Sequence, residues 1–186
     1  MLNKTIVLHA CCAICSGYPI SYLQYMGYSV VVYFYNPNIY PAAEYKKRLE
    51  AQKILCKKYD VILAEAEYSP EDFYKIAAGY ENEPERGTRC EKCFELRLEK
   101  TAEFACNNNI NEFTTSIAIS PHKNYTKLTE TGKKIAVKYG LKYLSTDFRK
   151  KDGFLKTNKI SRELHLYRQN YCGCEFSIAK SERNIN

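Results

Sequence analysis

Three cysteine motifs hold the most reactive side chains of this chain. They are Cys11-Cys12-Ala13-Ile14-Cys15, Cys90-Glu91-Lys92-Cys93 and Cys172-Gly173-Cys174. Cysteine thiolates bind zinc and hold iron–sulfur clusters, and a closely spaced pair can store two electrons as a disulfide. We therefore predict that the three motifs meet in space and form one metal and redox centre.

The first two motifs can hold a metal. Cys11, Cys12, Cys90 and Cys93 supply four sulfur ligands, the number that either a structural zinc or an iron–sulfur cluster takes. The three motifs together contain seven cysteines, which is more than one tetrahedral zinc needs and therefore favours redox chemistry. A zinc site remains the alternative at this point.

The third motif separates two cysteines by one glycine. A disulfide between Cys172 and Cys174 would be strained, and strained disulfides are labile. That suits a pair that is oxidised and re-reduced in each turnover, and two further metal ligands are the alternative. Cys56 and Cys106 fall inside amphipathic helices, so we expect them to be core residues, as free cysteines commonly are.

Alternating strands and helices must position these motifs. Hydrophobic periodicity and turn residues predict strands at 4–8, 28–35, 61–64, 112–117 and 141–144, and helices at 16–26, 42–58, 69–78, 90–107, 126–139 and 158–164. This order predicts an α/β fold, a Rossmann-like parallel sheet of the HUP-like kind with helices on both faces and a basic helical C-terminal segment. We expect residues 1–186 to form one domain, with 145–186 completing the active site.

Three loops are predicted to follow strands at the same edge of the sheet. The first cysteine motif follows strand one, Asn36-Pro37 follows strand two, and Ser120-Pro121 follows strand four. Sites of open parallel sheets gather beyond the carboxyl ends of the strands. We therefore expect one site at that edge.

Positive charge is concentrated in the last third of the chain. The chain has 28 Lys+Arg and 21 Asp+Glu, a formal charge of +7. Residues 1–120 carry 13 basic and 15 acidic side chains, whereas residues 121–186 carry 15 and 6. A basic half predicts a polyanionic partner, with nucleic acid the first choice and a merely solvated surface the alternative.

Nothing in the sequence predicts a membrane segment. The longest apolar runs are shorter than the roughly 18 residues of a spanning helix, and the first residues do not read as a signal peptide. Clustered cysteines in a reducing compartment indicate metal or catalytic sulfur rather than a disulfide framework. We expect a cytoplasmic protein.

The motifs together resemble the QueH-type epoxyqueuosine reductases over nearly the whole chain. The matching segments are His9-Ala10-Cys11-Cys12 through Cys15-Ser16, Tyr33-Phe34-Tyr35-Asn36-Pro37-Asn38-Ile39, Glu44-Tyr45 with Arg48, Arg89-Cys90-Glu91-Lys92-Cys93 with Arg97-Leu98, Thr114-Thr115-Ser116, Ile119-Ser120-Pro121-His122-Lys123-Asn124, Asp147-Phe148-Arg149-Lys150 and Tyr167 to Ser177. None of the motif cysteines departs from the pattern of that family.

The resemblance implies an oxidoreductase of tRNA queuosine biosynthesis. Its reaction would reduce the epoxide of epoxyqueuosine, at the wobble position of a tRNA with a GUN anticodon, to queuosine with loss of water. The resemblance also implies that Cys11, Cys12, Cys90 and Cys93 hold a 4Fe-4S cluster and that Cys172 and Cys174 form a redox-active disulfide. An electron donor, unidentified, must re-reduce the centre.

Some roles stay open even with the resemblance. Cys15 has no firm role, and an additional mononuclear iron beside the cluster, with Asp147 or another carboxylate as its partner, would use it. The leaving oxygen needs a proton donor. His9, Tyr35, Asp147 and Tyr171 are candidates that the sequence does not rank, and a structural histidine is the alternative for His9.

Contacts with RNA are expected in the basic half. Cations bind phosphates, and aromatic rings stack on unpaired bases. We expect Arg168 and the cluster Arg149, Lys150 and Lys151 to contact RNA, together with Lys123. The chain has 17 tyrosines, most of which we expect in the core or at its edge.

Two other functions compete with this interpretation. An ATP-dependent tRNA sulfur-transfer enzyme would need a glycine- and serine-rich phosphate loop after strand one, where this chain has cysteines instead. A zinc-stabilised RNA-binding module would use the same cysteines without catalysing a reaction. The oligomeric state cannot be predicted.

Overall fold

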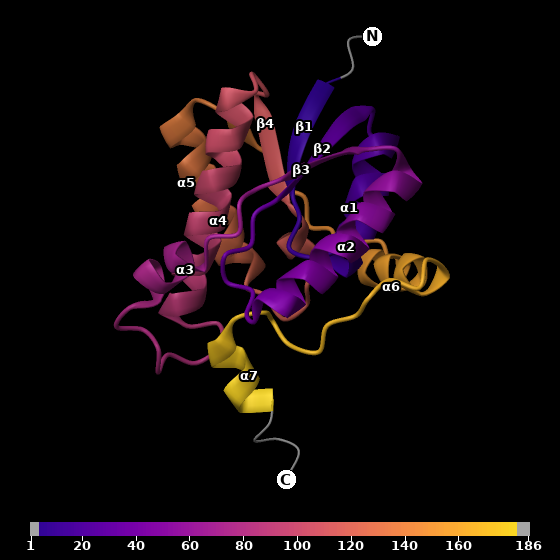
Figure 1. Cartoon of the computed structure of the whole chain (residues 1–186). Coiled ribbons are helices and arrows are strands. Elements are labelled where there is room, and N and C mark those ends of the chain that lie inside the picture. The colour runs from indigo at the N-terminus through magenta and orange to yellow at the C-terminus, as the bar shows by residue number, and fades with distance from the viewer. Residues whose placement is uncertain (1–3, 182–186) are drawn as a thin grey trace.

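A five-stranded parallel sheet forms the centre of the computed structural model, which describes residues 4–181, with side chains as far as residue 178 (Figure 1). The strands are β1 (Lys4–His9), β2 (Tyr28–Phe34), β3 (Ile62–Glu65), β4 (Glu112–Thr115) and β5 (Lys142–Tyr143). Their order is β3-β2-β1-β4-β5, and every neighbouring pair is parallel. The predicted Rossmann-like sheet is confirmed.

Helices cover both faces of the sheet (Figure 1). They are α1 (Ala13–Tyr25), α2 (Ala42–Tyr59), α3 (Pro70–Ala77), α4 (Thr88–Asn107), α5 (Tyr125–Tyr139), α6 (Gly153–Glu163) and α7 (Glu175–Ser181), with a 3-10 helix, η1, at Ser116–Ile119. Helix α1 packs against α2 and α6, and α4 packs against α5. No helix in the described ranges combines the length and apolar character that crossing a membrane requires.

Strand β1 separates two hydrophobic cores. Ile6 and Leu8 pack with residues of α1 and α2, whereas Val7 packs with residues of α4 and α5. Successive side chains of a strand point to opposite faces, so β1 is buried on both. All three residues are fully buried, as expected for the central strand of a sheet covered by helices.

The chain order reverses between β1 and β4. Strands β2 and β3 extend the sheet on one side of β1, and β4 and β5 extend it on the other. The loops that leave β1 and β4 therefore diverge at their carboxyl ends and leave a crevice, the usual position of a site in such sheets. Helix α7 lies beyond this edge, at the opposite end from Lys4 (Figure 1).

Several element boundaries differ from the predictions. The fourth strand ends at Thr115 rather than at 117, because the Thr115 hydroxyl accepts a hydrogen bond from the Ile117 amide (3.2 Å) and starts η1. Helix α6 begins at Gly153, in the predicted loop, where a Cβ atom would lie 1.8 Å from the Phe148 carbonyl oxygen. Helix α7 was not predicted. Residues 1–3 and 182–186, the ends of the predicted domain, lie outside the described residues.

Candidate redox and metal site

The carboxyl ends of the central strands border a cavity of about 460 Å³. Four cysteines line it: Cys11, Cys12, Cys15 and Cys172. Its charged lining residues are Arg48, Glu85, Arg86, Arg97, Lys123 and Arg168. Asn38 and Ser120 also line the cavity, which confirms that the loops after β1, β2 and β4 share one edge of the sheet.

The first cysteine motif brings three sulfurs together. The Sγ atoms of Cys11, Cys12 and Cys15 all lie within 4.8 Å of one another, at the start of α1. The Ser116 hydroxyl donates to Cys11 Sγ (3.4 Å), and Gln169 Nε2 donates to Cys12 Sγ (2.8 Å). This arrangement groups Cys15 with Cys11 and Cys12. The sequence alone had left Cys15 without a firm role.

Protons are shared unequally among these three thiols. Hydrogen bonds from Cys12 and Cys15 hold the pKa of Cys11 well below its usual range, and the Arg97 guanidinium acts in the same direction. Donating to Cys11 raises the pKa of Cys12 to about 12 and also raises the pKa of Cys15. These surroundings therefore favour the thiolate at Cys11 over the other two positions, and the thiolate is the form that binds metals.

The other two motifs form a second group of sulfurs. Burial and, to a smaller extent, the charge of Cys172 raise the pKa of Cys90. The same two causes raise the pKa of Cys93 to about 11. Cys93 and Cys174 belong to one small buried cluster with Phe73. The nine cysteines of the chain are all free thiols in this structure. Cys90 and Cys93 thus lie with the third motif, and neither of them lines the cavity.

Arg97 lies between the two sulfur groups. Its side chain, 4% exposed, donates to Asn36 Oδ1 (2.7 Å) and approaches Cys93 Sγ at 3.9 Å. Burial works against its charge, but the sulfurs of Cys93, Cys11 and Cys172 outweigh burial and raise the arginine pKa. Arg97 had no predicted role, although its position one helical turn after Cys93 indicated that the two side chains meet.

His9 is buried below the cavity. Its Nδ1 lies 2.9 Å from Thr115 Oγ1, and its Nε2 lies 3.1 Å from the Tyr35 carbonyl oxygen. Burial, followed by the charge of Arg97, lowers the pKa of His9 to about 3. The imidazole is therefore neutral and joins the ends of β1, β2 and β4. It does not line the cavity.

The other proton-donor candidates lie apart from one another. The Tyr35 hydroxyl donates to Asp72 Oδ2 (3.0 Å), outside the cavity lining. Asp147 lines a different hollow, of about 240 Å³, and both of its oxygens accept hydrogen bonds from Arg149 (2.8 Å each). Tyr171 alone among the four candidates lines the cavity of the cysteines, within the part of the chain that the structure describes.

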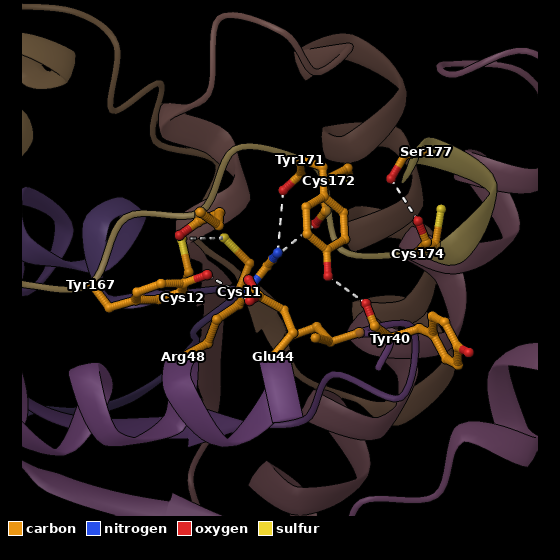
Figure 2. A network of polar contacts seen from close by, with 12 residues as sticks. Cys11, Cys12, Tyr40, Glu44, Arg48, Tyr167, Tyr171, Cys172, Cys174 and Ser177 are labelled. Carbon is orange, nitrogen blue, oxygen red and sulfur yellow. Dashed lines mark hydrogen bonds and ion pairs between the residues drawn. The ribbon is translucent and has the colours of Figure 1, made fainter. Parts of the chain in front are cut away.

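A buried polar network holds the third motif against α2 (Figure 2). Arg48 donates to Glu44 Oε1 (2.8 Å) and to the carbonyl oxygens of Cys172 (3.1 Å) and Tyr171 (3.2 Å). The second Glu44 oxygen accepts from the Tyr167 hydroxyl (2.6 Å). We call Glu44, Arg48 and Tyr167 the α2 network.

Gly173 fits closely into this arrangement. Its φ of +128° is rarely adopted by residues with a side chain, and a Cβ atom there would lie 3.0 Å from Arg48 Nη1. The Gly173 carbonyl oxygen accepts from the Tyr40 amide (2.8 Å). The glycine between Cys172 and Cys174 is therefore required by the backbone and by its neighbours.

The predicted RNA-binding residues are divided between the two hollows. Arg168 lines the main cavity and is exposed. Lys150 and Lys151 line the smaller hollow, and Arg149 lies over the Tyr125 ring there (5.1 Å). Lys123 lines the main cavity too, but its ammonium group contacts Cys172 Sγ (3.1 Å) rather than solvent.

Comparisons with known proteins identify the family. A model of the family described as "Epoxyqueuosine reductase QueH" matches residues 6–180. The QueH of Staphylococcus epidermidis is 39% identical over 184 residues, which cover 94% of this chain and 76% of that protein. The QueH of Thermotoga maritima is 36% identical over 177 residues, which cover 94% of this chain and 90% of that protein.

A solved structure shares the fold. The U34-tRNA thiolase NcsA from Methanococcus maripaludis with its 4Fe-4S cluster has a TM-score of 0.59 to this chain, with 13% sequence identity, and the match covers 94% of this chain and 61% of NcsA. That likeness concerns the arrangement of the sheet and helices. The family model and the relatives at 36–39% identity show that this chain belongs to the epoxyqueuosine reductase QueH family.

Proposed function

We propose that this chain reduces the epoxide of epoxyqueuosine in tRNA to the alkene of queuosine and releases water. The single observation that carries the proposal is that sulfurs of two distant motifs line one cavity, while Arg97, which also lines it, approaches Cys93 of the remaining motif at 3.9 Å. Such a gathering of thiols beside a cavity large enough for a nucleoside supports reductive chemistry on a bound ligand.

Thiolate donors are the type of ligand that a 4Fe-4S cluster takes. We propose Cys11, Cys12, Cys90 and Cys93 as its ligands, because thiolates are the usual ligands and both pairs lie near the Arg97 guanidinium, whose charge would offset that of a buried anionic cluster. When bound, the cluster would supply electrons one at a time. An additional mononuclear iron would take Cys15, with a partner other than Asp147, whose oxygens already bond to Arg149.

The third motif supplies the electron pair. Oxidation of the Cys172 and Cys174 thiols to a disulfide releases two electrons and two protons, the quantities needed to convert an epoxide into an alkene and water. Tyr171 is the candidate proton donor at the cavity, since its hydroxyl lies at the wall and donates to the Tyr40 carbonyl oxygen. We assign His9 a positioning role, because its Nε2 lies 3.4 Å from Arg97 Nε.

The substrate must be an unpaired nucleotide of an RNA loop. We propose that residues 145–186 complete the active site in the same domain as the sheet, with Arg168 at the cavity and Lys150 and Lys151 at the smaller hollow binding phosphates of a tRNA with a GUN anticodon. A donor, unidentified, re-reduces the disulfide. We expect this reaction in the cytoplasm, with other tRNA modification.

Anaerobic turnover of epoxyqueuosine-containing tRNA tests the proposal. Cluster-loaded protein with a chemical reductant should form queuosine, detected by nucleoside analysis, and should show the broad visible absorbance of an iron–sulfur protein, which bleaches on reduction. Cys90→Ser should lose the colour. The matched control Cys106→Ser should keep it, because Cys106 does not line the cavity and its thiol donates to the Tyr139 carbonyl oxygen (3.6 Å).

Two results would contradict the proposal. Fully loaded protein that forms no queuosine would remove the reaction. Colourless protein with stoichiometric zinc would favour the RNA-binding module.

A further inference from the structure

Lys123 lies at the sulfur of the third motif. Its ammonium group is 3.1 Å from Cys172 Sγ and 2.8 Å from Glu85 Oε1. The lysine follows η1 in the loop at the carboxyl edge of the sheet, 49 residues before Cys172 in the chain. Its side chain is only 13% exposed, so the contact is made largely out of water.

A buried ammonium group needs anionic partners. Burial alone would lower the pKa of Lys123, but the charges of Cys172 and Glu85 outweigh it and raise that pKa above the usual range. Lys123 therefore keeps its proton and its charge. A fixed cation beside a cysteine favours the thiolate over the thiol, and the thiolate is the reactive form.

The two sulfurs of the motif have unequal surroundings. Cys172 lines the cavity and contacts Lys123. Cys174 is buried in the small cluster with Phe73 and does not line the cavity. The Ser177 hydroxyl donates to the Cys174 carbonyl oxygen (2.7 Å). Of the two, only Cys172 contacts a cation and lines the cavity in the described part of the chain.

We propose that Lys123 stabilises the thiolate of Cys172, so that Cys172 is the cavity-facing sulfur of the pair and Cys174 is the resolving sulfur. This inference rests on the proposed function of the pair. In the reaction the Cys172–Cys174 bond forms and each sulfur loses one electron, and both electrons go to the epoxide. The Cys174 thiol gives up one proton and Tyr171 supplies the second, which it regains from solvent, so that the epoxide oxygen leaves as water. A dithiol reductant then attacks and restores the pair.

The proposal has a second consequence, for the reduction potential. Stabilising the reduced thiolate form makes a disulfide easier to reduce, so Lys123 raises the potential of the pair. Replacing Lys123 by Gln removes the charge while leaving a side chain that can still hydrogen-bond. The potential of K123Q should therefore be lower than that of the wild type.

Site-resolved alkylation tests the first part. Reduced, cluster-loaded full-length protein is treated with iodoacetamide at one fixed pH, and each cysteine peptide is quantified by mass spectrometry. K123Q should react about three- to tenfold more slowly at Cys172, with unchanged reaction at Cys106. K123R, which keeps the charge, should recover much of the rate. Equilibration with dithiothreitol buffers tests the second part, and a tenfold change in the equilibrium constant corresponds to about 30 mV.

Glu85→Gln separates an electrostatic role from a structural one. If Lys123 and Glu85 merely hold two loops together, both E85Q and K123Q should change Cys172 in the same direction. If Lys123 acts on the sulfur, E85Q should leave Cys172 as reactive as in the wild type or more so, because a nearby negative charge is removed. Thermal unfolding of both variants checks that each is folded.

Failure of this inference can be told from failure of the proposed function. Wild-type alkylation rates and potential in K123Q, or an E85Q variant that behaves like K123Q, would overturn the role of Lys123 whatever the queuosine assay gives. A Cys172–Cys174 pair that never oxidises would overturn the dithiol chemistry of the proposed function and the potential shift with it, whereas the alkylation result would still report on Lys123.

Discussion

Arg48 should be the most sensitive position outside the cysteines. Its guanidinium, 2% exposed, serves three acceptors from the middle of α2, and its loss would leave the Glu44 carboxylate buried with only the Tyr167 hydroxyl as partner. Breaking a buried ion pair by removing one member typically costs about 3–5 kcal/mol, because the remaining charge is uncompensated. We expect Arg48→Met to lower the free energy of unfolding by an amount in this range.

A double substitution separates the charge from the packing. In E44Q/R48M no buried charge remains, so its loss of stability should be smaller than the sum of the two single substitutions. Lys53→Met is the matched control, since Lys53 lies on the same helix but its pairs with Glu50 and Glu65 are exposed. Exposed pairs contribute little, so this variant should unfold almost as the wild type does.

Urea unfolding under anaerobic, reducing conditions measures these differences. The variants should shift the midpoint without changing the slope of the transition, because the surface exposed on unfolding is the same. Limited proteolysis should cut Arg48→Met faster between Tyr167 and Cys174, where two carbonyl oxygens have lost their donor. A loss below about 1 kcal/mol for Arg48→Met, the range of an exposed pair, would refute the reasoning.

Three further predictions concern single positions. Gly173→Ala should lower the free energy of unfolding by about 1–3 kcal/mol, because Gly173 has a positive φ and close neighbours. Gly27→Ala should lower it less, because Gly27 has a φ of +84° but open surroundings. Thermal unfolding measures both. Burial raises the pKa of Cys56 to about 11, so the folded state keeps a proton that the unfolded state loses. The free energy of unfolding should therefore fall between pH 9 and about 11. Urea midpoints measured across this range should show the fall, and Cys56→Ala should reduce it. Lys150→Gln should reduce, by about one, the slope of the logarithm of the binding constant for anticodon stem-loop RNA against the logarithm of the salt concentration. The control Lys57→Gln, at the opposite edge of the sheet, should leave this slope unchanged. An equal effect of both substitutions would contradict the proposed RNA surface.

The fold could be predicted because its signals are local. Buried strands separated by long amphipathic helices leave few alternatives to a parallel sheet, and helix α5 ends at Gly140, as predicted from the glycine. Helix α7 escaped prediction because a seven-residue segment is too short to show a helical period. The start of α6 at Gly153 depends on a contact with Phe148, which the hydrophobic pattern does not contain.

The edge of the sheet at which the candidate site lies could be predicted from the sequence. The contacts between individual side chains at the site could not be predicted. Strand order brings the loops after β1, β2 and β4 to one edge, and that follows from the connectivity. That Cys15 lies with Cys11 and Cys12 depends on where α1 begins, three residues earlier than predicted. The contact of Lys123 with Cys172 joins residues far apart in the chain, so no local pattern could indicate that this lysine faces sulfur.

The third motif is attached to the protein outside the central sheet. In the described part of the chain, Tyr167 to Cys174 adds no strand to the sheet and is fixed by α2 and neighbouring loops. Chimaeras that exchange this stretch between relatives would therefore exchange the proposed dithiol while keeping the strands of the sheet unchanged. Substitutions in the strands of the sheet should likewise leave the position of the third motif unchanged, provided that Glu44 and Arg48 are kept.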